Sequence, residues 1–255
     1  MKKLTLAIML ACAAGTVAAK DWKVIRFGVN ASYAPFESRS PSGQLIGFDI
    51  DLGNALCAKL KARCVWVENA WDGIIPGLQA KKFDAILSSM AVTDKRLQQI
   101  SFTEKIYNVP PRLVAKKGST LLPTIEQLRG KRIGVEQGST SEAYAKAYWE
   151  PQGVTVSSYQ TQDQVYQDLT SGRVDAAFQS SVQADIGFLK TAAGRDYAFA
   201  GGGVSDAKIL GVGAAIGLRK DDGDLAQLLN RALNELHKDG TYQRISQKYF
   251  SFDIY

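Results

Sequence analysis

The sequence predicts an α/β protein of two similar lobes, each built on a mostly parallel sheet that is flanked by helices. Apolar, strand-like runs alternate with amphipathic helical segments along most of the chain, a pattern typical of parallel sheets covered by helices. The alternation occurs twice, in units of roughly 90 to 100 residues that each have the size of a domain. A chain of 255 residues, 45% of them hydrophobic, is long enough to bury a core in both units.

The first 19 residues have the pattern of a secretory signal peptide. Two lysines precede an apolar run at 4–14, and the stretch ends in alanines at 18 and 19. The apolar run is too short to span a bilayer, because a spanning helix needs about 20 apolar residues. We therefore expect export to the periplasm with cleavage after Ala19. Lipidation of Cys12 stays open as an alternative, although Met-Leu-Ala at 9–11 is a poor lipidation context.

The elements of the first unit follow in order along the chain. VIRFGVN at 24–30 predicts a strand, and an amphipathic helix is expected at about 49–60. A second helix is expected around the apolar residues at 74–78. Within the phrase KKFDAILSS at 81–89, the apolar run at 83–87 then predicts a buried strand, which two serines follow.

The second unit has the same order of elements. KRIGVEQ at 131–137 predicts a strand, and a helix is expected at about 141–148. The apolar residues at 165–169 predict another helix, and GRVDAAFQSS at 172–181 repeats the strand that ends in hydroxyls.

Polar residues follow the apolar strands at four places, residues 30–33, 88–96, 137–141 and 179–181. In open α/β sheets, ligands bind beyond the carboxyl ends of the strands, often against helix N-termini. Two lobes that face each other through these loops would form a cleft. The sequence therefore predicts a ligand site between the lobes.

The segment SSMAVTDKR at 88–96 leaves two interpretations open at this point. One is a helix cap, in which a Ser or Thr oxygen accepts a backbone N–H bond. The other is an anion site, in which Arg96, one turn beyond the serines, binds a carboxylate through its planar guanidinium.

Cysteine, histidine and charge counts narrow the class of protein further. Cys57 and Cys64 remain after removal of the leader, and a closely spaced pair in an exported chain predicts a disulfide. Two thiols and one histidine, His237, are too few for a metal site, so we expect no metal and no cofactor.

The net charge of the mature chain is modest. Loss of the two leader lysines lowers the formal charge from +6 to +4, and the sequence contains no block of five like charges. Nucleic acid is therefore not an expected partner.

Six phrases in one order resemble the periplasmic binding proteins of polar amino acid ABC transporters, and most of all the lysine/arginine/ornithine- and histidine-binding proteins. The phrases are YAPFES (33–38), GFDIDLGNALC (47–57), KKFDAILSS (81–89), LTSGRVDAAFQ (169–179), GVGAAIGLRKDD (211–222) and DGTYQRISQKYFSFDIY (239–255).

The resemblance covers the whole mature length and implies a two-lobed, type II periplasmic binding protein fold with a two-strand hinge. It implies that 20–109 and 209–255 form the first lobe and 110–208 the second. The expected function is to capture an amino acid and deliver it to the permease subunits of an ABC transporter. We expect a monomer without enzymatic activity.

The resemblance also assigns roles to residues of the cleft. It implies that Arg96 forms a bidentate salt bridge to the α-carboxylate of the ligand, assisted by Ser88, Ser89 and Thr140. The turn Gly-Ser-Thr at 138–140 would offer N–H groups at a helix start.

Two aromatic residues, Tyr33 and Trp71, match the positions that hold the ligand's side chain in the family. Stacking of a cationic or apolar side chain between such rings contributes about 0.5–2 kcal/mol per ring.

The chain departs from the family at several of these positions. Ser180 and Asn30 stand where the cationic binders carry aspartates for the α-ammonium and for the distal cation. Ala91 replaces a serine and Ser141 a glutamine, while Glu136 is an added acid at the end of a strand. These changes favour a ligand whose charge lies elsewhere or whose amine is substituted, such as an opine, or a guanidino compound bound by Glu136.

Two other functions stay open. Exported cyclohexadienyl and arogenate dehydratases use the same fold, and Glu136 would be the candidate general acid of such an enzyme. A sensory protein that reports to a chemoreceptor would have the same sequence features as a transport protein.

Overall fold

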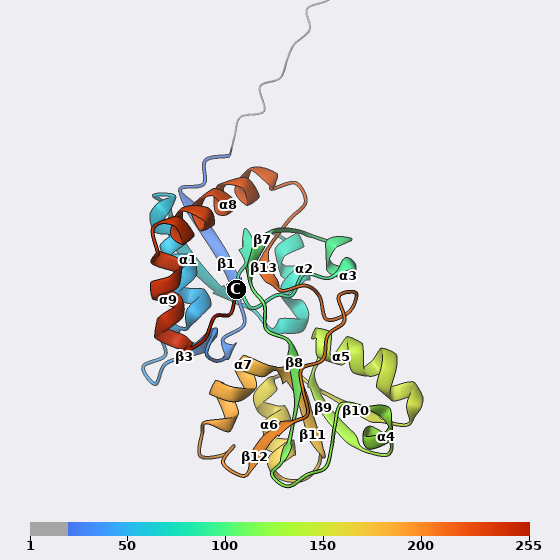
Figure 1. Ribbon diagram of the computed structural model, residues 1–255. Helices are drawn as coiled ribbons and strands as arrows, with labels where there is room; N and C mark the ends of the chain where they lie inside the picture. Colours follow the sequence, from blue (N-terminus) through green and yellow to red (C-terminus); the bar gives the residue numbers. More distant parts are fainter. Residues whose placement is uncertain (1–19) are drawn as a thin grey trace, which may run out of the picture.

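The computed structural model describes residues 20–255, so the predicted signal peptide and Cys12 lie outside the described residues. The chain forms two α/β lobes, one above the other in Figure 1, and each lobe is built around a five-stranded sheet. Helices flank both sheets, which confirms the predicted fold class.

The sheet of the first lobe has the strand order β5-β1-β6-β13-β7. Its strands are β1 (Val24–Val29), β5 (Arg63–Glu68), β6 (Ala85–Ile86), β7 (Ser101–Tyr107) and β13 (Ala214–Leu218). β1 runs parallel to β5 and β6, whereas β13 is antiparallel to β6 and β7. The chain therefore leaves this sheet after β7 and returns to it through β13.

Helices and a small sheet complete the first lobe. The helices are α1 (Phe48–Lys59), α2 (Ile74–Gln79), α3 (Asp94–Leu97), α8 (Gly223–Lys238) and α9 (Thr241–Tyr249). Leucines spaced three and four residues apart along α8 are buried against the sheet, because this spacing places them on one face of a helix. A three-stranded sheet of β2 (Ser32–Tyr33), β3 (Glu37–Arg39) and β4 (Leu45–Ile46) lies beside them.

The sheet of the second lobe has the order β10-β9-β11-β8-β12. Its strands are β8 (Pro111–Lys116), β9 (Arg132–Glu136), β10 (Thr155–Tyr159), β11 (Ala176–Ser180) and β12 (Tyr197–Ala200). β9 runs parallel to β10 and β11, and β8 is antiparallel to β11 and β12.

The described helices of the second lobe are α4 (Ile125–Leu128), α5 (Thr140–Tyr144), α6 (Gln162–Thr170) and α7 (Ser181–Ala184). Three of them, α5, α6 and α7, begin just after the parallel strands β9, β10 and β11, whereas α4 precedes β9. α5 continues as a π-helical turn at Ala145–Trp149, so the helical segment reaches the length that the sequence predicts.

The chain crosses between the lobes twice. The crossings are residues 108–110, between β7 and β8, and residues 201–213, between β12 and β13. The boundaries that we propose between the lobes, after residues 109 and 208, lie within these segments.

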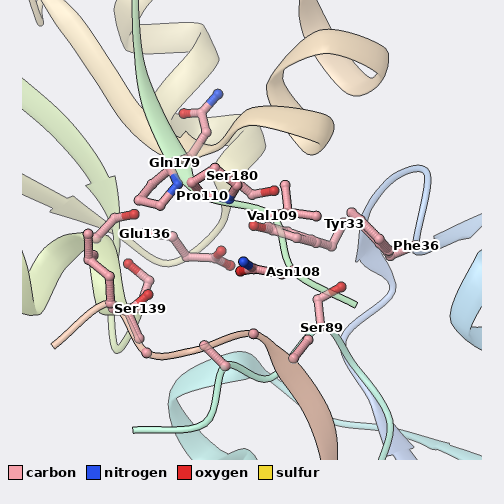
Figure 2. A pocket seen from close by; sticks show the side chains of 18 of the residues that line it. Tyr33, Phe36, Ser89, Asn108, Val109, Pro110, Glu136, Ser139, Gln179 and Ser180 are labelled. Atoms are coloured by element: carbon pink, nitrogen blue, oxygen red, sulfur yellow. The ribbon is translucent and has the colours of Figure 1, made fainter. Parts of the chain in front are cut away.

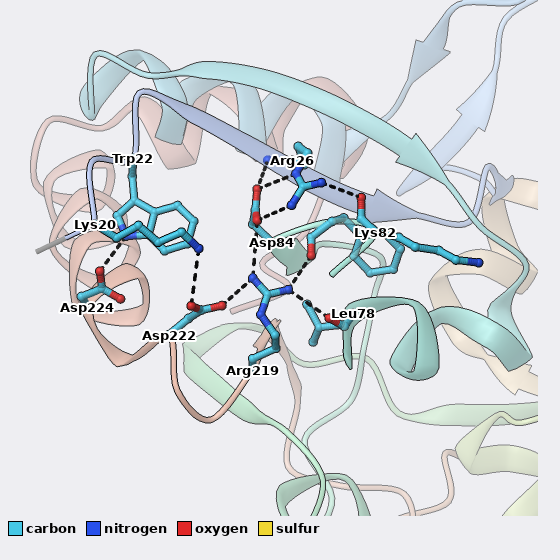
Figure 3. A network of polar contacts seen from close by, with 10 residues as sticks. Lys20, Trp22, Arg26, Leu78, Lys82, Asp84, Arg219, Asp222 and Asp224 are labelled. Carbon is cyan, nitrogen blue, oxygen red and sulfur yellow. Dashed lines mark hydrogen bonds and ion pairs between the residues drawn. The ribbon is translucent and has the colours of Figure 1, made fainter. Parts of the chain in front are cut away.

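A polar network holds the returning segment against the first lobe (Figure 3). Arg26 of β1 pairs with Asp84 at 2.8 Å, and Arg219, just after β13, reaches the same carboxylate at 3.4 Å. Arg219 also pairs with Asp222 at 2.5 Å. The shared carboxylate therefore links the first strand of the chain to the segment that precedes α8.

Cys57 of α1 and Cys64 of β5 form a disulfide, which confirms that prediction. The bond closes the turn between the helix and the strand, with 5.8 Å between the two Cα atoms. No helix within residues 20–255 is both long and apolar enough to cross a membrane.

Candidate functional site

A cavity of about 440 Å³ lies between the two lobes and is lined by residues of both lobes and both crossings. All ten residues that the sequence nominates for ligand binding line this cavity. They are Asn30, Tyr33, Trp71, Ser88, Ser89, Arg96, Glu136, Thr140, Ser141 and Ser180. Figure 2 shows the view into the cavity, toward which Tyr33, Glu136 and Ser180 point.

Arg96 enters the cavity from the short helix α3, which Thr93 caps. The Thr93 hydroxyl accepts a hydrogen bond from the Arg96 N–H at 3.3 Å, so the interpretation as a helix cap is correct for this threonine. The Arg96 side chain is buried, with 8% of its surface exposed, and its guanidinium donates to the Ala91 carbonyl at 2.9 Å. Burial lowers the pKa of Arg96 to about 10, which still leaves it charged at neutral pH.

The Arg96 guanidinium lies over the Trp71 ring, 5.3 Å from its centroid, and donates to the Gly138 carbonyl of the second lobe at 3.3 Å. No carboxylate within residues 20–255 pairs with it. A buried cation without a counter-ion is costly unless an anion joins it. The cavity is therefore suited to a ligand that carries a carboxylate.

The turn at 138–140 is organised by its own side chains. Gly138 takes a positive φ of 76°, and its N–H donates to the Glu142 carboxylate at 2.6 Å. The Ser139 hydroxyl accepts from the Glu142 N–H at 3.0 Å, so Ser139 caps the helix while the Glu142 carboxylate reaches back to the residue before the cap. Some of the N–H groups that the sequence suggests for a ligand thus donate to side chains of the turn itself. Thr140 and Ser141, which follow the turn, line the cavity.

Ser88 is held by a buried hydrogen-bond chain on the first lobe. Its hydroxyl accepts from the Asn30 N–H at 3.0 Å and donates to the Glu37 carboxyl at 2.8 Å. The Asn30 side-chain oxygen in turn accepts from the Ser32 N–H at 3.1 Å. Because the only hydroxyl proton of Ser88 is used by Glu37, we propose that Ser88 positions its neighbours instead of donating to the ligand.

A second buried chain orients Ser89. Asp49 accepts from the Ser89 N–H at 2.8 Å and from the Tyr107 hydroxyl at 3.0 Å. The Ser89 and Tyr107 hydroxyls are 2.8 Å apart. Since Tyr107 gives its proton to Asp49, Ser89 donates to Tyr107, which leaves the lone pairs of its oxygen available to the cavity.

The carboxyl groups of Glu37 and Asp49 are both buried and lie beside each other. Burial and the neighbouring Asp49 charge raise the pKa of Glu37 well above its usual range, while burial raises the pKa of Asp49 to about 6. Two carboxylates in contact cannot both be charged at low cost. Glu37 therefore holds the proton of the pair at neutral pH, and Asp49 carries the charge.

Glu136 ends β9 and is 7% exposed. Burial, with a smaller contribution from Asp163, raises the pKa of Glu136 to about 8. No lysine or arginine of the described chain forms an ion pair with it. In Figure 2 its carboxyl group and the side chain of Asn108 point toward the same space. The second lobe therefore presents an acid that lacks a cation.

Ser180 ends β11, and its buried hydroxyl makes no hydrogen bond to any described residue. Asp185, the nearest acid further along the chain, pairs with Lys190 at 2.6 Å and does not line the cavity. Asp185 is therefore not placed to supply the charge that is lost at Ser180.

Sequence reasoning did not identify several other residues of the cavity wall. They are Glu37, Tyr107, Asn108, Gln162 and parts of the second crossing between 204 and 213. Gln162 had a usable signal, because it follows the end of β10 and starts α6. The second crossing had no such sequence signal, since its place in the cavity depends on the return of the chain to the first sheet.

Two α/β lobes that share a cavity with a buried, unpaired cation and an unpaired acid define a two-lobed binding protein for a small polar solute. The chain belongs to the bacterial extracellular solute-binding proteins, family 3, whose family model matches residues 25–252. The resemblance that its phrases predict is thus confirmed.

Similar proteins extend over the full chain. The histidine-binding periplasmic protein of Escherichia coli K12 is 49% identical over 258 residues, which is 100% of this chain and 99% of that protein. The lysine/arginine/ornithine-binding periplasmic protein of the same strain is 50% identical over 252 residues, 99% of this chain and 96% of that protein. The structure of an ancestral arginine-binding protein bound to arginine has a TM-score of 0.83 and 33% identity, and covers 90% of this chain and 99% of that one.

Proposed function

We propose that this protein is exported to the periplasm, captures an amino acid between its lobes and delivers it to the permease subunits of an ABC transporter. The single observation that carries the proposal is the buried Arg96 guanidinium, which faces the cavity without a carboxylate partner. Its relatives are periplasmic proteins named for histidine or for lysine, arginine and ornithine, which supports an amino acid as the ligand.

The α-carboxylate binds to the fork of N–H groups on Arg96. A planar guanidinium matches the two oxygens of a carboxylate, and such paired, charge-assisted hydrogen bonds are among the strongest in proteins. Trp71 covers one side of the guanidinium, and the Ala91 carbonyl fixes one of its nitrogens. Thr140 lines the cavity from the opposite lobe and assists.

The α-amino group binds to neutral acceptors. The Ser89 oxygen has lone pairs available, and the Ser180 hydroxyl is free to accept. Neither supplies a charge, so an ordinary α-ammonium gains less here than beside an aspartate. We propose a cationic amino acid or a derivative with a substituted amine, such as an opine, as the ligand.

Closure of the lobes couples capture to delivery. Arg96 belongs to the first lobe and Glu136, Thr140 and Ser180 to the second, so a ligand that contacts both stabilises the closed form. A permease that recognises the closed form distinguishes the loaded protein from the empty one.

A dehydratase-like enzyme is the second candidate, because Glu136 holds a proton at neutral pH and faces the cavity, as a general acid would. An unpaired acid is equally suited to a cationic ligand, and the full-length relatives are named as binding proteins, so we propose a binding protein without enzymatic activity. Turnover of prephenate or arogenate by the purified protein would instead establish the enzyme. A sensory role through a chemoreceptor would use the same ligand and the same closure.

The proposal is tested by calorimetry of purified protein with amino acids and with their methyl esters. We expect the free acid to bind at least tenfold more tightly than the ester, because the ester cannot form the charged pair with Arg96. Equal affinities would reject the carboxylate site. Protein recovered from the periplasm should begin at Lys20 by mass spectrometry.

A further inference from the structure

The strand β9 and the helix α6 fix the place of Glu136 on the second lobe. Gly134 lies two residues before Glu136, so both face the same side of the sheet. A Cβ atom at Gly134 would lie 2.8 Å from the Val165 side chain, which shows that α6 packs on this side. Gln162 lies one turn before Val165, at the start of α6, and lines the cavity. Glu136 therefore lies beside the first turn of α6.

A buried chain of side chains fixes the orientation of Gln162. Its amide nitrogen donates to the Gln179 oxygen at 2.5 Å, and the Gln179 nitrogen donates to the Tyr166 hydroxyl at 2.8 Å. Tyr166 then donates to the Gln183 oxygen at 2.6 Å. Every donor in the chain points away from Gln162, so the Gln162 carbonyl oxygen is its free end.

The wall of the second lobe thus presents hydrogen-bond acceptors with which no lysine or arginine of the described residues pairs. Glu136 offers a carboxyl group, Gln162 offers a carbonyl oxygen, and Asp163 adds a further negative charge nearby. On the first lobe, by contrast, one oxygen of Glu37 accepts from Ser88, and Asp49 accepts from Ser89 and Tyr107, while the second Glu37 oxygen is buried without a partner among the described residues.

We propose that Glu136 and Gln162 of the second lobe receive a cationic nitrogen group of the ligand, of guanidinium or ammonium chemistry. The inference rests on the proposed function, in which Arg96 of the first lobe binds the carboxylate. The two opposite charges of the ligand then lie on different lobes, and the ligand itself joins them. A ligand without the cation still binds to Arg96 but stabilises the closed form less.

Binding of the cation also displaces a proton. Burial and Asp163 of α6 raise the pKa of Glu136 to about 8, and the groups that face it from the first lobe are Tyr33 of β2 and Glu37 of β3. Glu136 is therefore mostly protonated near neutral pH in the empty protein, whereas a bound cation favours its charged form. Proton release provides a second measurement that is independent of affinity.

The experiment compares two matched ligand pairs by calorimetry near neutral pH. L-Arginine is paired with L-citrulline, and L-lysine with L-norleucine, so that each pair differs in the distal cation. Glu136→Gln is the test variant, and Glu150→Gln, an exposed glutamate of the same lobe, is the matched control. Each titration is repeated in a second buffer with a different ionisation enthalpy, which measures the protons released.

For at least one pair, the wild type and Glu150→Gln should prefer the cationic member at least tenfold and release protons on binding it. Glu136→Gln should lower that preference to less than threefold and abolish the release. An unchanged preference in Glu136→Gln would overturn the inference, and so would a wild type without preference in either pair. If a neutral amino acid still binds and Arg96→Ala abolishes its binding, the proposed function stands without this inference.

Discussion

The Arg96 guanidinium of the first lobe donates a hydrogen bond to the Gly138 carbonyl of the second lobe, over 3.3 Å. This contact crosses the cavity beside the position that we propose for the ligand's carboxylate. The lobes thus meet at Arg96, the residue that we propose as the carboxylate binder, so in this proposal binding and closure depend on the same side chain.

A ligand should close the lobes, because its binding surface is divided between them. X-ray scattering should show a smaller radius of gyration at saturating ligand than in the empty protein. The melting temperature should rise with ligand concentration, since only the folded protein binds. Scattering curves that superimpose with and without a ligand of proven affinity would contradict a closing mechanism.

Ser180→Asp should tighten the binding of free L-arginine or L-lysine. The new carboxylate supplies a charged partner for the α-ammonium, and such a hydrogen bond contributes about 1.5–3 kcal/mol, or roughly 10- to 150-fold in affinity. Nα-acetyl-L-arginine is the control ligand, because its amide carries no charge and should gain nothing. Equal gains for both ligands, or none for either, would show that Ser180 does not face the amino group.

Glu37→Gln should make the protein more stable than the wild type at neutral and alkaline pH. Burial and Asp49 raise the pKa of Glu37 in the folded state, so its stabilising effect is complete below its unfolded pKa and is lost as the pH rises through its folded pKa. Glutamine keeps the bond from Ser88 but cannot ionise. In the wild type, ionisation of Glu37 should lower the free energy of unfolding by up to about 1.4 kcal/mol for each unit by which the pH rises. The Glu37→Gln variant should lack this decrease.

Urea unfolding at several pH values measures this difference. Glu235→Gln, at an exposed glutamate of α8 in the same lobe, is the control and should keep the wild-type slope. Parallel profiles for the wild type and Glu37→Gln would mean that Glu37 is charged in the folded protein.

Replacing Cys57 and Cys64 together by alanine should lower the free energy of unfolding. The disulfide spans a sequence separation of 7, and closing so short a loop contributes about 2–3 kcal/mol. Ligand affinity should stay unchanged, because neither cysteine lines the cavity. A double variant that unfolds at the wild-type urea concentration would show that the α1–β5 turn is rigid without the bond.

The sequence predicted the architecture because both lobes rely on local patterns. The apolar runs at 24–30 and 131–137 and the helical spacing at 165–169 depend on neighbouring residues alone, and all three form the expected elements. The predicted strand at 83–87 is shorter in the structure, where only Ala85–Ile86 pair as a strand. Asp84, the residue before this strand, accepts a hydrogen bond from the Arg26 side chain.

The cavity lining was predictable where polar residues follow an apolar strand, as for Arg96 in 88–96 and Ser180 in 179–181. Glu37 was not, because a glutamate after YAPF carries no local sign that it is buried against Asp49 and Ser88. Gln162 was likewise missed, since the direction of its amide depends on Gln179, which is 17 residues away in sequence. Contacts of this kind follow from tertiary packing and leave no periodic pattern in the chain.

Titration calorimetry of Arg96→Ala, with a ligand that binds the wild type, tests whether Arg96 binds the carboxylate of the ligand. Lys95→Ala, an exposed cation on the same helix, is the control. Removing a charged partner from a closed cleft costs about 2–5 kcal/mol, so affinity should fall roughly 30-fold to several thousand-fold, with the control unchanged. A fall of less than threefold in a folded Arg96→Ala protein would mean that Arg96 does not bind the carboxylate.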